Sequence, residues 1–137
     1  MSKNKYPYIA RGNQRYVAFR SETFNIDSGT ASTVDDVIFS DLPTDAIIVE
    51  VHPVYLTATD TAGAASATYS LGTTAGGVDI VAAVALEVSK AVGAAGAAAT
   101  IAVDRIAAGG TLFARHSGIA ATEAGTYYLQ ILVMLAP

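Results

Sequence analysis

The segment that most constrains the fold is the run from Thr126 to Leu135, close to the end of the chain. It is rich in aromatic and aliphatic residues and has no glycine, proline or charge, which favours a strand. A strand with one side in water alternates apolar and polar residues, but both alternating sets here are largely apolar. We therefore expect one face in the core and the other covered by another element of the chain or by a neighbouring subunit. The first set is Tyr127, Leu129, Ile131, Val133 and Leu135, and the second is Tyr128, Gln130, Leu132 and Met134.

Short strands separated by turns of Gly, Thr and Asp are expected along the rest of the chain, and no stretch has the length of an amphipathic helix. The alternation is clearest from residue 46 to 59, where Ile47, Val49 and Val51 are predicted to share one face. Pro53 has no amide hydrogen to donate, so it predicts a sheet edge or a bulge at that point. The predicted strands are residues 16–23 (running on to 26), 34–40, 46–59, 67–71, 100–104, 111–116 and 126–135.

Two segments break the alternating pattern. Residues 78–88 are predicted as a single helical turn or an irregular crossover. Residues 90–99 consist mostly of Ala and Gly and are predicted as a loop tip or a hairpin connection. With seven or eight short strands, the sequence predicts an all-β fold, an antiparallel β-sandwich with a jelly-roll-like or Greek-key topology. The sandwich is assigned to residues 21–137, after an extended N-terminal arm of residues 1–20.

The composition excludes several classes of protein. The chain has 137 residues and no cysteine, which excludes disulfide scaffolds, thiolate zinc sites and thiol nucleophiles. No run reaches the roughly 20 apolar residues of a membrane helix, and the basic first residues lack the apolar stretch of a signal peptide. The apolar fraction is 52%, but alanine supplies 27 residues, so the core is modest. We expect one domain without a membrane partner.

The charges are unevenly distributed. Residues 1–20 carry five basic and no acidic side chains, together with three tyrosines and a phenylalanine, whereas residues 21–137 carry three basic side chains and all twelve acids. A basic, aromatic arm before an acidic body is typical of a docking segment for a negative surface, although an ordinary frayed terminus has the same position. The acidic body would repel a duplex and no nucleic-acid-binding module is present, so an acidic protein surface is the expected partner.

No catalytic or metal-binding motif is visible. His52 and His116 fall in predicted strands, and no spacing pairs either one with a nucleophile. The glycine-rich run that starts at Gly72 lacks the lysine of a phosphate-binding loop. The acids between Asp35 and Asp45 lack the alternating spacing of a calcium loop. We expect no enzyme, no metal and no cofactor.

The order of segments resembles a known family, the small structural proteins of tailed-bacteriophage virions. The resemblance covers about residues 40–137 and rests on pattern rather than on one specific motif. The chain is similar in particular to the head decoration, or cement, proteins of this family. The segments that carry it are Leu42-Pro-Thr-Asp-Ala-Ile-Ile-Val-Glu-Val, Ala67-Thr-Tyr-Ser-Leu-Gly-Thr-Thr-Ala-Gly-Gly-Val-Asp-Ile-Val-Ala-Ala-Val, Gly109-Gly-Thr-Leu-Phe-Ala-Arg and Gly125-Thr-Tyr-Tyr-Leu-Gln-Ile-Leu-Val.

This resemblance implies a compact β-sandwich that binds the outer surface of a phage head and clamps neighbouring subunits of the major capsid protein. It implies a virion protein made in the cytoplasm of a bacterial host, with no catalytic residues. We expect a homo-oligomer, with a trimer favoured. The candidate capsid-binding residues of the arm are Lys3, Lys5, Tyr6, Tyr8, Arg11 and Arg15, and the candidate subunit interface is Tyr128, Leu132 and Met134.

Two other functions remain open from the sequence. One is a tail, baseplate or head-fibre component of the same kind of particle. The other is a carbohydrate- or receptor-binding module, because β-sandwiches host such sites on the same architecture. The absence of tryptophan offers sugars fewer aromatic platforms.

Overall fold

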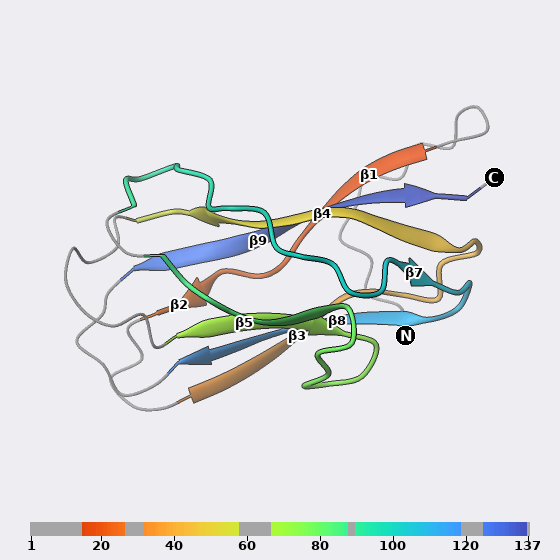
Figure 1. Cartoon of the computed structure of the whole chain (residues 1–137), viewed down its shortest axis with the longest axis horizontal. Helices are drawn as coiled ribbons and strands as arrows, with labels where there is room; N and C mark the ends of the chain where they lie inside the picture. The colour runs from red at the N-terminus through yellow and green to blue at the C-terminus, as the bar shows by residue number, and fades with distance from the viewer. Residues whose placement is uncertain (1–14, 27–31, 58–66, 88–89, 119–124, 137) are drawn as a thin grey trace.

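The structure, a computed structural model, describes residues 15–26, 32–57, 67–87, 90–118 and 125–136. Two antiparallel sheets pack face to face, with β1, β9 and β4 in one layer and β3, β8 and β5 in the other (Figure 1). The predicted all-β sandwich is therefore confirmed. The strands are β1 (Arg15–Arg20), β2 (Phe24–Asn25), β3 (Ser32–Ser40), β4 (Ala46–Tyr55), β5 (Thr68–Gly72), β6 (Val81–Ala85), β7 (Arg105–Ile106), β8 (Thr111–Gly118) and β9 (Thr126–Leu135).

The strand order is that of a jelly roll. The first sheet runs β1-β9-β4-β7, with β2 also paired to β9, and the second runs β3-β8-β5-β6. Each strand of the first half of the chain thus pairs with its counterpart counted back from the end: β1 and β2 with β9, β3 with β8, β4 with β7, and β5 with β6. This is the pairing of one long hairpin wound into two sheets, as in eight-stranded jelly rolls.

The first predicted strand is interrupted between β1 and β2, although both pair with β9 in the first sheet. The backbone N–H of Ser21 donates to the carbonyl of Leu129 on β9, and the hydroxyl oxygen of Ser21 accepts a hydrogen bond from the Leu129 N–H. The next N–H, of Glu22, donates to the buried carboxylate of Asp36 on β3, at 2.8 Å. The buried carboxylate satisfies a backbone donor that has no partner in the β9 ladder at this interruption. Residues 15–26 therefore form two short strands, β1 and β2, with Ser21 to Thr23 between them.

A bulge in β4 changes the predicted faces of that strand. Ile48 is opposite Val133 and Glu50 is opposite Leu132, so Val49 is the extra residue. Val49 and Glu50 are both exposed, and Val51 is buried with Ile48 instead of sharing a face with Ile47 and Val49. The prediction of the faces was wrong from this residue on, because a bulge shifts the alternation by one.

At Pro53, the backbone nitrogen and the carbonyl face the side of β4 that is away from β9. Its carbonyl accepts a bond from the N–H of Gly96 at 2.8 Å, so the missing amide hydrogen of the proline points to the same side, out of the β4-β9 ladder. The ladder itself stays regular, with Pro53 opposite Leu129. The prediction of a sheet edge or a bulge at Pro53 was wrong, because β4 lies between β9 and residues 93–99 at this point and its bulge lies at Val49.

Three predictions for the middle of the chain were wrong. Residues 81–85 form β6, paired with β5, instead of a helical turn or a crossover. The predicted strand 100–104 is irregular, and only Arg105 and Ile106 pair with β4. The Ala/Gly segment is no loop tip, because it runs beside β4 through the bridge between Val54 and Ala95. Small side chains carry little periodic signal, so an edge strand of alanines cannot be told from a loop by pattern.

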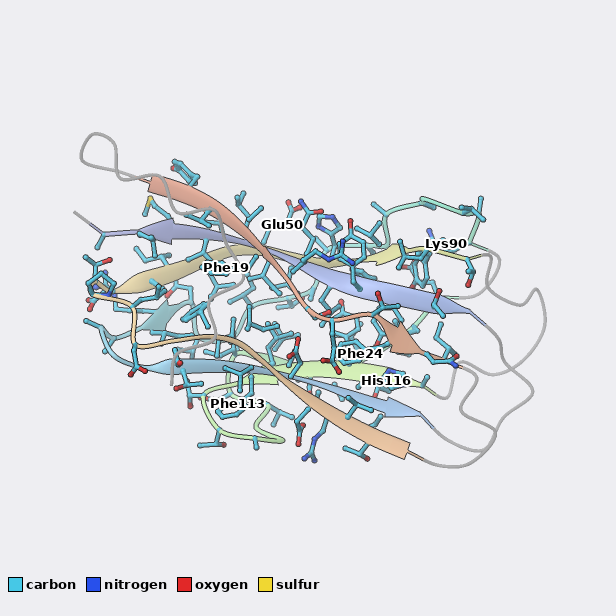
Figure 2. All side chains as sticks on the ribbon, turned by 180° about the vertical axis from the view of Figure 1, so that it is seen from behind. Phe19, Phe24, Glu50, Lys90, Phe113 and His116 are labelled. Carbon is cyan, nitrogen blue, oxygen red and sulfur yellow. The ribbon has the colours of Figure 1, made fainter. Side chains whose placement is uncertain are left out.

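The core contains a polar, aromatic group between the sheets. The ring of His116, on β8, stacks on Phe24 at 5.5 Å, and its Nδ1 lies 2.6 Å from the hydroxyl of Tyr127. Figure 2 shows Phe19, Phe24 and His116 between the two layers. Burial raises the pKa of the Tyr69 and Tyr127 hydroxyls, and it lowers the pKa of His116. This part of the core is uncharged in the folded protein at neutral pH.

The buried histidine predicts a loss of stability on mild acidification. An unfolded histidine has a pKa of about 6.5, and the folded pKa is lower, so unfolding takes up a proton below that pH. The free energy of unfolding should fall by up to about 1.4 kcal/mol per pH unit as the pH drops from about 6.5 toward 5. Urea unfolding at a series of pH values measures this.

A control variant separates His116 from the other groups. His116→Gln removes the buried imidazole and should flatten the slope. The lowered pKa values of Asp35, Asp45 and Asp79 place their own contributions at more acidic pH. A pH-independent stability of the wild type between 6.5 and 5 contradicts the assignment.

Candidate assembly surface

The outer side of the first sheet is apolar over three adjacent strands. Strands β1, β9 and β4 run side by side, so their outward side chains form cross-strand rows. Tyr16 and Val49 are the most exposed large apolar residues on it, at 60% and 45%. We call this surface the β9 outer face. Its members are Tyr16, Ala18 and Arg20 on β1, Tyr128, Gln130, Leu132 and Met134 on β9, and Ile47, Val49, Glu50, His52 and Val54 on β4.

The rows place the apolar side chains at one end of this face. Met134 lies between Tyr16 and Ile47, and Leu132 lies between Ala18 and the bulge at Val49. The side chains of β9 are half-buried by these neighbours, whereas those of β1 are exposed. Among the residues that the structure describes, no element lies over the face. The apolar character that the sequence assigned to the second side of β9 is therefore on the surface of the single chain.

The charged groups of the β9 outer face lie in its two middle rows, on the two flanking strands. The guanidinium of Arg20, on β1, stands 3.7 Å from the centre of the Tyr128 ring, which is a cation–π geometry. On β4, Glu50 lies 3.0 Å from Nδ1 of His52. Figure 2 shows Glu50 on the outer side of its layer. The face thus has a positive group on one side of β9 and a negative group on the other.

An uncharged ridge, residues 91–103, extends the face beyond β4. Its backbone bonds to β4 at Ala94, Gly96 and Ala99, with N···O distances of 2.8 to 2.9 Å. Gly96 lies so close to Pro53 that a Cβ would stand 2.5 Å from the proline ring. Ala102 then donates to Ile80, next to β6, so the ridge closes the side of the sandwich. Val92 is 70% exposed on it.

The outer side of the second sheet is different in kind. Arg115, on β8, makes two hydrogen bonds to the carboxylate of Asp35, on β3, at 2.7 and 2.8 Å. These bonds hold the pKa of the Asp35 carboxyl below its usual value. The turn at Gly76 covers the guanidinium so closely that a Cβ would lie 2.6 Å from it. The two outer sides therefore differ within the described residues: the first is apolar over three adjacent strands, whereas the second has a charged pair on its two neighbouring strands β3 and β8.

The predicted site residues fall into three groups. Tyr128, Leu132 and Met134 lie together on the β9 outer face, half-buried. Arg15 belongs to β1, opposite Leu135, so residues 15–20 are part of the first sheet and the separate arm is at most residues 1–14. The remaining arm residues, Lys3, Lys5, Tyr6, Tyr8 and Arg11, lie outside the described residues.

Sequence reasoning did not find the flanking members of the face. Ile47 and Tyr16 could have been found by extending the alternation of their strands, since both are apolar residues out of phase with the buried set. Val49 and Glu50 could not, because their common orientation depends on the bulge. Arg20 was assigned to the arm, and its place beside β9 follows from the β1–β9 register.

The titratable groups of the described residues do not form a reactive site. His116 is 1% exposed and is bonded to a tyrosine hydroxyl, while His52 lies at the surface beside Glu50. Asp45 holds Arg105 and the backbone N–H of Ala108. Within the described ranges, no group of three or more His, Asp or Glu side chains could hold a metal ion. In that same part of the chain, no helix has the length and apolarity needed to cross a membrane.

A comparison with solved structures finds a similar chain in the cyanophage Pam1 capsid asymmetric unit. The match has a TM-score of 0.54 and 21% sequence identity, and it covers 95% of this chain and 93% of the other. At this identity the likeness shows a shared fold over nearly the whole length. No protein-family model matches the sequence, and no curated protein matches it.

Two adjacent residues of β9 give a direct test of which side is core. Ile131 is fully buried and Leu132 is on the β9 outer face. Ile131→Ala should lower the free energy of unfolding by about 2–5 kcal/mol, as expected for a core cavity, and Leu132→Ala should lower it by less than about 1 kcal/mol. Urea unfolding of dilute protein measures both. Equal losses would mean that the outer side is covered within the single chain.

Proposed function

We propose that this protein is a structural component of a tailed-phage virion, a decoration or cement protein on the outer surface of the head. The observation that carries the proposal is the match along 95% of the chain to a chain of a cyanophage capsid asymmetric unit. The resemblance of residues 40–137 to virion structural proteins points the same way. The partner is the major capsid protein, and binding would stabilise contacts between neighbouring capsid subunits. The role needs no catalysis, metal or cofactor.

The surface of the body supports an adhesive role. The most apolar part of the described surface is the β9 outer face, with the uncharged ridge of residues 91–103 beside it. Large exposed apolar surfaces mark sites of protein association. Self-association through Tyr128, Leu132 and Met134 is part of the proposal, and a trimer was favoured from the sequence alone.

The N-terminal arm is proposed as the segment that contacts the capsid. Residues 1–14 carry three basic side chains and no acid, and they include two tyrosines. A negative capsid surface would attract these charges, and burial of the tyrosines would offset the entropy lost on ordering. Because copies in an oligomer present several arms at once, weak individual contacts would combine into tight attachment. The residues proposed for this contact are Lys3, Lys5, Tyr6, Tyr8 and Arg11, with Arg15 at the start of β1.

Removal of the arm tests the capsid contact. A variant lacking residues 1–14 keeps every described strand, whereas a deletion to residue 20 would also remove β1. We expect the variant to fold with unchanged circular dichroism and to bind undecorated heads at least tenfold more weakly than the full chain. Co-sedimentation with heads that lack the protein measures the binding. A second variant replaces the three basic residues of the arm by Gln. It should bind more weakly than the full chain at low salt, and this difference should shrink as the salt concentration rises.

The outcomes separate the candidate roles. Full binding by the truncated chain would remove the arm from the account. Labelled protein found on tails or fibres of purified particles, and not on heads, would contradict a head decoration role. Binding to a glycan array without binding to heads would favour the carbohydrate-binding alternative.

A further inference from the structure

The charges of the β9 outer face are arranged on opposite sides of its central strand. Arg20 is opposite Gln130 on the β1 side, and His52 is opposite Gln130 on the β4 side. Glu50, one row further along, lies 3.0 Å from His52. The face therefore carries a cation at the β1 flank and an anion at the β4 flank, close to the same level of β9. A surface of this kind can be complementary to a copy of itself.

One of the two simple two-fold packings brings these charges together. Two sheets that pack face to face keep their strands within about 30° of each other. A two-fold axis parallel to β9, lying between the two faces, places β4 of one copy over β1 of the other and keeps each row at its own level. Arg20 of each copy then lies opposite His52 of its partner, one row from the partner's Glu50. Met134 and Leu132 face their own equivalents, and Tyr16 faces Ile47.

The other in-plane axis is unfavourable. An axis perpendicular to the strands, between the rows of Gln130 and Leu132, places β1 over β1 and β4 over β4. Arg20 would then lie opposite Ala18 of the partner and one row from its Arg20, and Glu50 would lie opposite His52 and one row from the partner's Glu50. Like charges this close across an interface cost free energy and disfavour that arrangement. The formal charges therefore favour the axis parallel to β9.

We propose that two copies of this chain associate through their β9 outer faces about a two-fold axis parallel to β9, with Arg20 of each copy paired to Glu50 of the other. The inference rests on the self-association in the proposed function and specifies its face, axis and ion pair. It gives a two-fold pair in place of the trimer favoured from the sequence. Both copies use the same patch, as two-fold symmetry requires.

The area of the β9 outer face determines how strongly two copies are expected to associate. Four rows along three strands span roughly 20 Å by 10–15 Å at normal strand spacings, and the ridge of residues 91–103 adds one further strand width. This is smaller than the roughly 800 Å² per partner of a typical stable interface. The pair is therefore weak in solution and is strengthened when both copies are held on one lattice.

Charge reversal tests the pairing, with the full chain throughout. Arg20→Glu alone and Glu50→Arg alone should each weaken self-association at least tenfold in sedimentation equilibrium, because each places like charges together twice in a two-fold pair. The double variant Arg20→Glu/Glu50→Arg should associate again. An equimolar mixture of the two single variants should form a mixed pair, since one chain then carries only acidic and the other only basic partners. Thr33→Glu adds a charge to the outer side of the second sheet and should have no effect.

The results that overturn the inference are distinct from those that overturn the proposed function. If the wild type associates and neither single reversal weakens it, another surface makes the contact and the inference fails, while binding to heads is untouched. The inference also fails if the protein sediments with the mass of three chains and neither charge reversal changes that mass. If the full chain is monomeric up to hundreds of micromolar and removal of residues 1–14 makes it associate, the arm covers the face and the two-fold pair is wrong. Failure of the wild-type chain itself to bind undecorated heads would count against the proposed function instead.

Discussion

The structure depends on β9, which has one face in the core and an apolar face on the surface. Its inward set, from Tyr127 to Leu135, is fully buried between the sheets, and its backbone holds β1 and β2 on one side and β4 on the other. The strand is therefore the central member of the first sheet, and its sequence is apolar on both sides. One face of the strand is already buried in the core, so an apolar second face exposed to solvent lowers the solubility of the single chain. The association proposed above would offset that loss of solubility.

The bulge at Val49 turns this constraint into a specific surface. Without the extra residue, the side chains of β4 after Ile48 would exchange faces, and Val51 would leave the core. With it, Val49 and Glu50 both reach the outside, one apolar and one charged, beside Leu132. The acidic group thus lies across β9 from Arg20, which the β1 register places on the opposite flank. A local irregularity of one residue gives the face its complementary charges.

The sequence predicted most of the fold, because long strands of large side chains carry a strong periodic signal. β9 was found with both of its ends, and the half-buried side of Tyr128, Leu132 and Met134 followed from the same alternation. β6 and the 91–103 ridge were missed, since alanines give no contrast between inside and outside. The bulge and the strand pairing could not be predicted from the sequence, because both depend on contacts between residues distant in the chain. The positions of Arg20 and Glu50 on the β9 outer face therefore followed only from the strand register in the structure.

The central claim is that the β9 outer face is covered in the assembled particle. Hydroxyl-radical footprinting tests it most directly, because Tyr16 and Met134 lie on that face and both side chains oxidise readily when reached by solvent. The account predicts strong oxidation of both in dilute free protein and marked protection of both in intact particles. Equal oxidation of Tyr16 and Met134 in the two states would contradict it.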